Sequence, residues 1–153
     1  IYQCDWSSDV CSSDLMKEWS NDSIIDATAM EKEVLKISHL HGKYLNVMSF
    51  HRHILRKLDA DYKTMKGLRE DYYSGHLTQE ECDERGWEYM QHVHSNPKIA
   101  RLLETDQELT KILLKKIAHE EIVSYCESVL KSLNGRTWDL GNFIKYQQLT
   151  SGR

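Results

Sequence analysis

The residues best suited to bind another molecule lie between Arg52 and Tyr73, where basic and aromatic side chains occur close together. Lysine and arginine bind phosphates through charge, with a salt-dependent and sequence-independent affinity. Tyrosine rings stack on unpaired bases. The candidate nucleic-acid-binding residues are Arg52, Arg56, Lys63, Lys66, Arg69, Tyr72 and Tyr73. These residue types favour contact with nucleic acid. In the simpler interpretation the charged residues only form a solvated helix face and the tyrosines only pack against other side chains.

Charge is distributed unevenly along the chain. From Lys36 to Arg69, eight lysines and arginines stand against Asp59 and Asp61, which gives a local charge of +6. Residues 80–88, in contrast, contain five acids and one arginine. Such asymmetry is typical of proteins that bind nucleic acids.

Signatures of catalysis and metal binding are missing. The chain has eight histidines, but pairs such as His51 and His53 are two residues apart, so they diverge on a helix. There is no HExxH, GxSxG, phosphate-binding glycine loop or GxGxxG, which are the signatures expected of several enzyme classes. We therefore expect neither an enzyme nor a bound cofactor or metal.

The first fifteen residues need separate treatment. Residues 4–15, CDWSSDVCSSDL, resemble a translated sequencing-library adapter. A natural Ser/Asp-rich leader with a cysteine pair is the alternative. We expect residues 1–15 to be an adapter-derived, disordered artefact that is dispensable, and residues 16–153 to form one domain.

The cysteines and the hydropathy of the chain indicate the cellular environment in which it folds. Outside residues 1–15 only Cys82 and Cys126 remain, without CxxC spacing, which favours a reducing compartment. No apolar run approaches eighteen residues, so we expect no membrane span.

The elements that position the candidate residues are expected to be helices. Strand patterns are absent, and only one proline and seven glycines interrupt the helical periodicity. Asp26 predicts the start of a short N-terminal helix that runs to about Ile37. A long helix follows over residues 39–74, with apolar positions in alternating steps of three and four residues, and Ser74 and Gly75 predict its end.

The second half of the chain repeats this arrangement. Residues 76–96 predict a loop with a short helix that Thr78 and Glu81 cap. Pro97 opens a second long helix that ends near Gly135, and Thr137 caps a short C-terminal helix. The fold class is therefore all-α, with two long helices in a helical bundle or coiled-coil-like packing. A helix about 50 Å long exceeds what one small subunit covers, so we expect a homo-oligomer.

The same stretch of basic and aromatic residues resembles a known family. Residues 66–75, KGLREDYYSG, resemble the ssDNA-binding motif of the phage UvsY recombination mediators. The Ile25-Asp26 pair, the residues from Leu40 to Tyr44 and the ending NGRTW at 134–138 are also similar to that family. Arg69 matches the motif's arginine, whereas Gly67 stands at its lysine position, with Lys66 displaced by one residue.

The resemblance implies a non-enzymatic recombination mediator encoded by a bacteriophage and acting in the cytoplasm of the host bacterium. Its implied partners are ssDNA, a RecA-like recombinase and single-strand-binding protein, and its implied assembly is a ring-like homo-oligomer with a role in DNA recombination, repair and replication. The alternative is a structural coiled-coil assembly protein without a specific DNA role.

Overall fold

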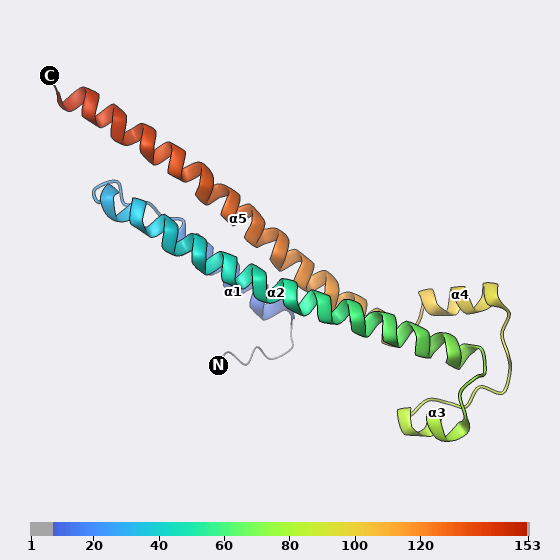
Figure 1. Cartoon of the computed structure of the whole chain (residues 1–153). Coiled ribbons are helices and arrows are strands. Elements are labelled where there is room, and N and C mark those ends of the chain that lie inside the picture. Colours follow the sequence, from blue (N-terminus) through green and yellow to red (C-terminus); the bar gives the residue numbers. More distant parts are fainter. Residues whose placement is uncertain (1–7, 153) are drawn as a thin grey trace. The chain divides into compact units, whose positions relative to one another are not determined.

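The computed structural model describes residues 8–152, with side chains from Ser13 onward, and its regular elements in this range are all α-helices (Figure 1). The helices are α1 (Ser8–Asp22), α2 (Met30–Tyr73), α3 (Gln79–Arg85), α4 (Asn96–Glu104) and α5 (Gln107–Ser151). The all-α fold class with two long helices is thus confirmed. None of the described helices is long and apolar enough to span a membrane.

The chain forms two compact units. The first contains the residues up to His53 together with Ala118–Arg153, and the second contains Ile54–Ile117. Both long helices contribute a segment to each unit, so every unit includes a part of α2 and a part of α5.

The core of the first unit is built from α1, α2 and α5. Its buried members are Leu15, Leu40, Tyr44, Met48, Ile122, Cys126, Val129, Leu130 and Leu133. They recur at three- and four-residue steps, which places them on one face of each long helix. Burial raises the pKa of the Cys126 thiol to about 11, so this cysteine is a packing residue.

Polar contacts tie α1 and the following loop to this core. Asp22 accepts hydrogen bonds from the Tyr44 hydroxyl at 3.0 Å and from Lys43 Nζ at 2.7 Å. Arg136 Nη2, on α5, donates to the Ser23 carbonyl at 2.9 Å. These bonds hold the loop between α1 and α2, and Trp19 packs edge-on against Tyr44 with ring centroids 5.5 Å apart.

The beginning of the chain differs from the expectation. Residues 8–15 belong to α1 instead of being disordered, and Leu15 is buried in the first unit's core. The structure does not describe residues 1–7, so the expectation for them lies outside the described range. Whether residues 1–15 are an adapter-derived artefact stays a prediction.

The expected short N-terminal helix is also corrected. Asp26 closes a turn in which its Oδ1 accepts from the Thr28 backbone N–H at 2.8 Å, and α2 then runs without interruption from Met30. Leu40 and Tyr44, buried on either side of Gly42, keep the helix continuous. Their burial outweighs the roughly 1 kcal/mol that a helical glycine costs relative to alanine.

The helices of the C-terminal half differ from the prediction at two places. The second long helix is interrupted at Thr105 and Asp106, which separate α4 from α5. α5 then continues through Gly135 and Thr137, so there is no separate C-terminal helix. Leu133 and Leu140 are buried on either side of that glycine and hold the helix together.

Local signals predicted the other ends correctly. Gly75 has a φ of 72° and follows the end of α2, as a left-handed helix-ending residue does. Thr78 and Glu81 form the complete capping box of α3, and Pro97 occupies the first turn of α4. These turns fold the chain back so that α3 and α4 belong to the same unit as the end of α2.

A histidine pair joins α2 and α5 in the first unit. His51 Nδ1 and His119 Nδ1 are 2.7 Å apart, so one ring must donate and the other accept. Burial, assisted by the neighbouring His119, lowers the pKa of His51 to about 4, and burial also lowers the pKa of His119. Just below pH 6.5 an unfolded histidine is mostly protonated, whereas the folded state favours the neutral form of both rings.

We predict that this pair makes stability fall on mild acidification. The folded pKa of His51 is depressed from 6.5 to about 4, so its contribution is present above pH 6.5 and is lost as the pH falls toward 4. Urea unfolding at fixed protein concentration between pH 7 and pH 4.5 measures the effect. The double variant His51→Leu with His119→Leu should show a flatter pH dependence.

His53→Gln is the matched control, because His53 is an exposed histidine on the same helix. Its pH dependence should equal that of the parent. An unchanged pH dependence in the double leucine variant would contradict the assignment.

Candidate functional site

The predicted arginine lies in the last turns of α2 and is bonded within the second unit. Arg69 Nε donates to Asp106 Oδ2 at 2.6 Å, and Arg69 Nη2 donates to the Tyr73 hydroxyl at 2.9 Å. The Tyr73 hydroxyl donates in turn to the same Asp106 oxygen at 2.7 Å. The side chain of Asp106 is 0% exposed and that of Arg69 is 12% exposed, so the pair is almost fully removed from solvent.

Asp106 also starts α5. Its second oxygen, Oδ1, accepts from the backbone N–H groups of Glu108 at 2.9 Å and Leu109 at 3.1 Å. Burial alone raises the pKa of the carboxyl, but the bonds from Tyr73, the Leu109 backbone and Arg69 outweigh it and lower the pKa below its usual value. One ionised carboxylate therefore links the end of α2 to the start of α5.

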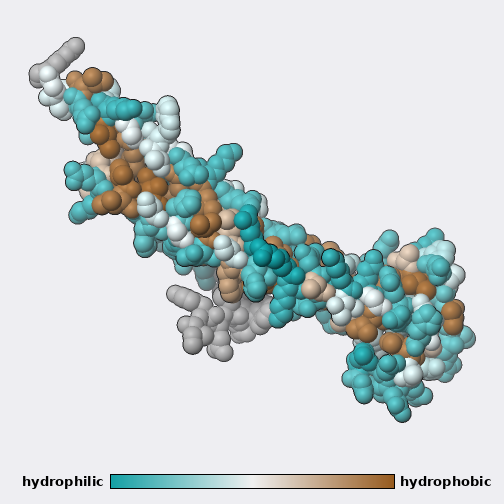
Figure 2. Space-filling model, in the orientation of Figure 1, coloured by the Kyte–Doolittle hydropathy of each residue, from teal (hydrophilic) through white to brown (hydrophobic). Residues whose placement is uncertain are grey.

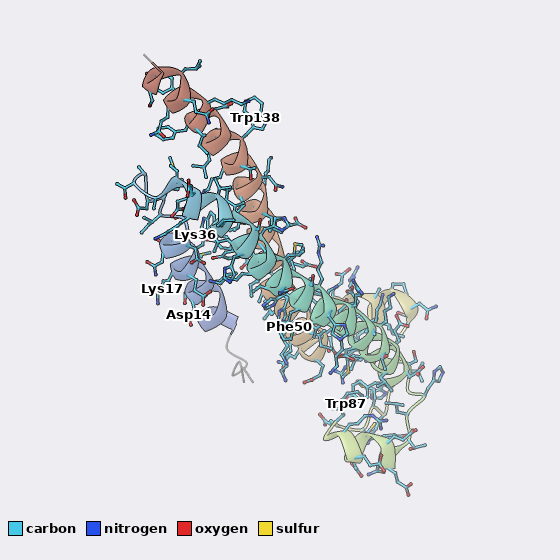
Figure 3. All side chains as sticks on the ribbon, turned by 60° about the vertical axis from the view of Figure 1, so that its left-hand side comes forward. Asp14, Lys17, Lys36, Phe50, Trp87 and Trp138 are labelled. Carbon is cyan, nitrogen blue, oxygen red and sulfur yellow. The ribbon has the colours of Figure 1, made fainter. Side chains whose placement is uncertain are left out.

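Aromatic rings enclose the guanidinium group. The Arg69 carbon Cζ is 4.4 Å from the ring centroid of Trp87, 4.5 Å from that of Tyr72 and 4.9 Å from that of Tyr73. Tyr72 is fixed by its hydroxyl, which donates to the Glu88 carbonyl at 2.6 Å. Figure 3 labels Trp87, which lies in the loop after α3. These are cation–π contacts in a desolvated setting, where they are strongest.

The structure thus brings three of the predicted residues together, with a packing role for each. Tyr72 and Tyr73 are both only 8% exposed and belong to a core with Cys82 and Ile99. The positive charge of Arg69 is neutralised by the carboxylate of Asp106. Contact of these three side chains with DNA stays a prediction, and their observed role is to hold the second unit together.

Three other candidates lie on an open face of α2. Arg56, Lys63 and Lys66 are exposed, and their spacings of seven and three residues place them on one side of the helix. Asp59 and Glu70 fall on the same side, but Asp59 forms an ion pair with Lys116. Exposed cations of this kind are suited to phosphate contacts.

The glycine at the motif's lysine position is unobstructed. A Cβ atom added at Gly67 meets no atom within 4 Å, so Gly67 marks no close helix contact and the position has room for a side chain.

Arg52 belongs to the first unit and has a partner there. Its Nη2 lies 2.6 Å from Glu127 Oε1 on α5, and the two side chains are 45% and 54% exposed. Such an exposed ion pair contributes about 0–1 kcal/mol, so it leaves Arg52 able to exchange partners.

Sequence reasoning missed Asp106 and Trp87. Asp106 follows Thr105 and precedes a run of helix formers, which is the signal of an N-cap aspartate, but the long helix predicted to begin at Pro97 runs through this position. Trp87 carried no local signal, because its importance comes from a contact with Arg69 eighteen residues earlier. Among the described residues, no group of three or more His, Cys, Asp or Glu side chains is placed to hold a metal ion.

We predict that Asp106→Ala destabilises the protein strongly. The variant leaves Arg69 buried without its counter-charge and uncaps α5, and breaking a buried pair in this way costs about 3–5 kcal/mol. Urea unfolding followed by far-UV circular dichroism measures the loss. The double variant Arg69→Leu with Asp106→Ala should lose less than the two single variants combined, since no unpaired charge remains.

Lys66→Ala is the control on the same helix and should change stability by no more than about 0.5 kcal/mol. An Asp106→Ala variant as stable as this control would show that the buried pair does not hold the unit.

The sequence of this chain matches a known protein family. A family model described as "Recombination, repair and ssDNA binding protein UvsY" matches residues 18–153. The recombination protein UvsY of Enterobacteria phage T4 is 21% identical over 140 residues, which cover 92% of this chain and 97% of the relative.

Solved structures agree at the level of the fold. A crystal structure of the bacteriophage T4 recombination mediator protein UvsY superposes with a TM-score of 0.78 at 20% identity, over 90% of this chain and 97% of that one. A second crystal lattice of the same protein gives a TM-score of 0.78 at 21% identity, over 91% and 96%. Because the family model spans all of the chain from residue 18 onward, this protein belongs to the UvsY family of recombination, repair and ssDNA-binding proteins.

Proposed function

We propose that this protein is a recombination mediator that binds ssDNA. The observation that carries the proposal is the family match over residues 18–153. The exposed cations on α2 supply the physical means, because Arg56, Lys63 and Lys66 can bind phosphates without reading sequence. The protein acts by binding and does not catalyse a reaction.

The buried cluster defines how these cations are presented. Arg69, Tyr73 and Asp106 hold the end of α2 against the start of α5. Substitutions in the cluster therefore act on DNA binding through the shape of the unit, whereas Lys63 and Lys66 contact the strand. Arg52, in the first unit, contacts a phosphate when Glu127 releases it.

Loading of a RecA-like recombinase is the proposed outcome of binding. The mediator holds a strand covered by single-strand-binding protein and helps the recombinase to nucleate on it, in the cytoplasm of the bacterial host. In a ring-like homo-oligomer, several copies of the cationic face bind one strand, and modest contributions from each subunit add up to tight binding.

We predict that the double variant Lys63→Ala with Lys66→Ala weakens ssDNA binding about equally for all sequences. The slope of log K against log salt should become shallower by up to about 0.7 for each phosphate that a subunit no longer binds. Fluorescence anisotropy with labelled oligonucleotides at several salt concentrations measures both quantities. Folding should be unaffected, since both lysines are exposed.

Two further variants sharpen this test. Lys17→Ala removes an exposed lysine of α1 and should leave the slope unchanged. Gly67→Lys adds a lysine at an unobstructed position and should tighten binding and steepen the slope. If the double alanine variant bound like the parent at every salt concentration, the DNA site would lie elsewhere, and the structural-assembly alternative would be favoured.

An exposed apolar face supports self-association. Figure 2 shows hydrophobic surface over the C-terminal part of α5, and Trp138 projects outward in Figure 3. The exposed fractions are 75% for Trp138, 65% for Tyr146 and 77% for Leu149. Large side chains exposed together in this way indicate an association surface.

We predict that this face joins copies of the chain. The double variant Trp138→Glu with Leu149→Glu should shift the protein toward monomer in sedimentation velocity, because charges are costly to bury in an apolar interface. Gln148→Glu, at an exposed neighbouring position, should keep the assembly of the parent. A parent protein that sediments as a monomer at micromolar concentration would contradict both the interface and the ring.

A further inference from the structure

A cavity of about 410 Å³ lies beside the buried arginine in the second unit. Its walls come from the end of α2 (Arg69, Tyr72 and Tyr73), from residues 86–88, and from Leu102 and residues 105–108 at the junction of α4 and α5. The volume falls within the range of about 300–1,000 Å³ that is usual for small-ligand sites.

Trp87 gives the cavity a fixed aromatic wall. Its backbone N–H donates to the Cys82 carbonyl at 2.9 Å, and Arg69 and Tyr72 pack against its ring at 4.4 Å and 5.3 Å. The residue is only half-buried, so part of it stays open to solvent. A tryptophan held in place by its neighbours is a stacking surface that loses little conformational freedom when a flat ligand binds.

The charges that line the cavity exclude a phosphate. Arg69 is the one cation among the lining residues, and Asp106 neutralises it at 2.6 Å. Glu88 and Glu108 are also lining residues, and Glu108 forms an ion pair at 2.8 Å with Lys111. The lining therefore carries a formal excess of negative charge, which repels an anion.

The same chemistry suits a nucleobase. A base is flat and uncharged, and it stacks on aromatic rings with about 1–3 kcal/mol per base. Base edges also carry N–H donors, and the lining residues Glu88, Thr105, Gln107 and Glu108 all have side-chain oxygens of the kind that accept such bonds. An unstacked base is thus the ligand class that agrees with the volume, the aromatic wall and the charge of the cavity.

We propose that this cavity takes up a nucleobase of the bound single strand, stacked on Trp87, while the phosphates stay outside it. This inference rests on the proposed ssDNA binding and extends it. The bases of the strand bind in this cavity, and the phosphate backbone binds the exposed lysines. It also gives Arg69 a role that needs no phosphate, since Arg69 supports the ring on which the base stacks.

The test compares a thymidine oligonucleotide with an abasic strand of the same length and charge. The full chain should bind the thymidine strand at least about five-fold more tightly, which corresponds to the lower limit of base stacking. In Trp87→Leu this ratio should fall toward one, with the abasic affinity and the salt slope unchanged. Trp87→Tyr keeps a stacking ring and should retain most of the ratio.

A second measurement uses the unaltered protein, so it does not depend on how the Trp87 variants fold. Irradiation of the complex with an oligonucleotide that contains 5-iodouracil should join the base to Trp87 or Tyr72, and peptide mapping identifies the linked residue. Equal affinity of the parent for both strands, or linkage only at other residues, would overturn the nucleobase site and leave ssDNA binding intact. If neither strand bound, the proposed function itself would fail.

Discussion

The second unit depends on one buried ion pair. Arg69 and Asp106 are thirty-seven residues apart in sequence and 2.6 Å apart in the structure. Their contact fixes the end of α2, starts α5 and provides the surface on which Trp87 lies. Two charges without solvent are tolerated only when their hydrogen bonds are satisfied, and here Tyr73 and two backbone N–H groups complete the carboxylate's set.

The fold was predictable wherever the signal was local. Gly75, the Thr78 and Glu81 capping box and Pro97 act within one turn, so their sequence spacing is sufficient. The errors arose where packing outweighs local preference. Gly135 reads as a helix end, but the burial of Leu133 and Leu140 keeps α5 continuous.

For the candidate residues, the sequence indicated the chemical type of each side chain better than its place in the fold. Residue type identified Lys63 and Lys66 as candidate phosphate contacts, and the structure leaves them exposed. Residue type could not show that Arg69 has a buried partner, because that partner lies beyond two short helices and their loops. A positive charge in a basic segment looks identical in sequence whether it faces solvent or a carboxylate.

The full set of bonds to Asp106 has a consequence for how this protein can vary. Both carboxylate oxygens are in use, and an asparagine would present an N–H₂ group to donors that need an acceptor. A change at position 69, 73 or 106 therefore leaves a buried group without its partner. Descendants of this sequence should exchange these three residues together or keep them all, while the exposed lysines are free to change one at a time.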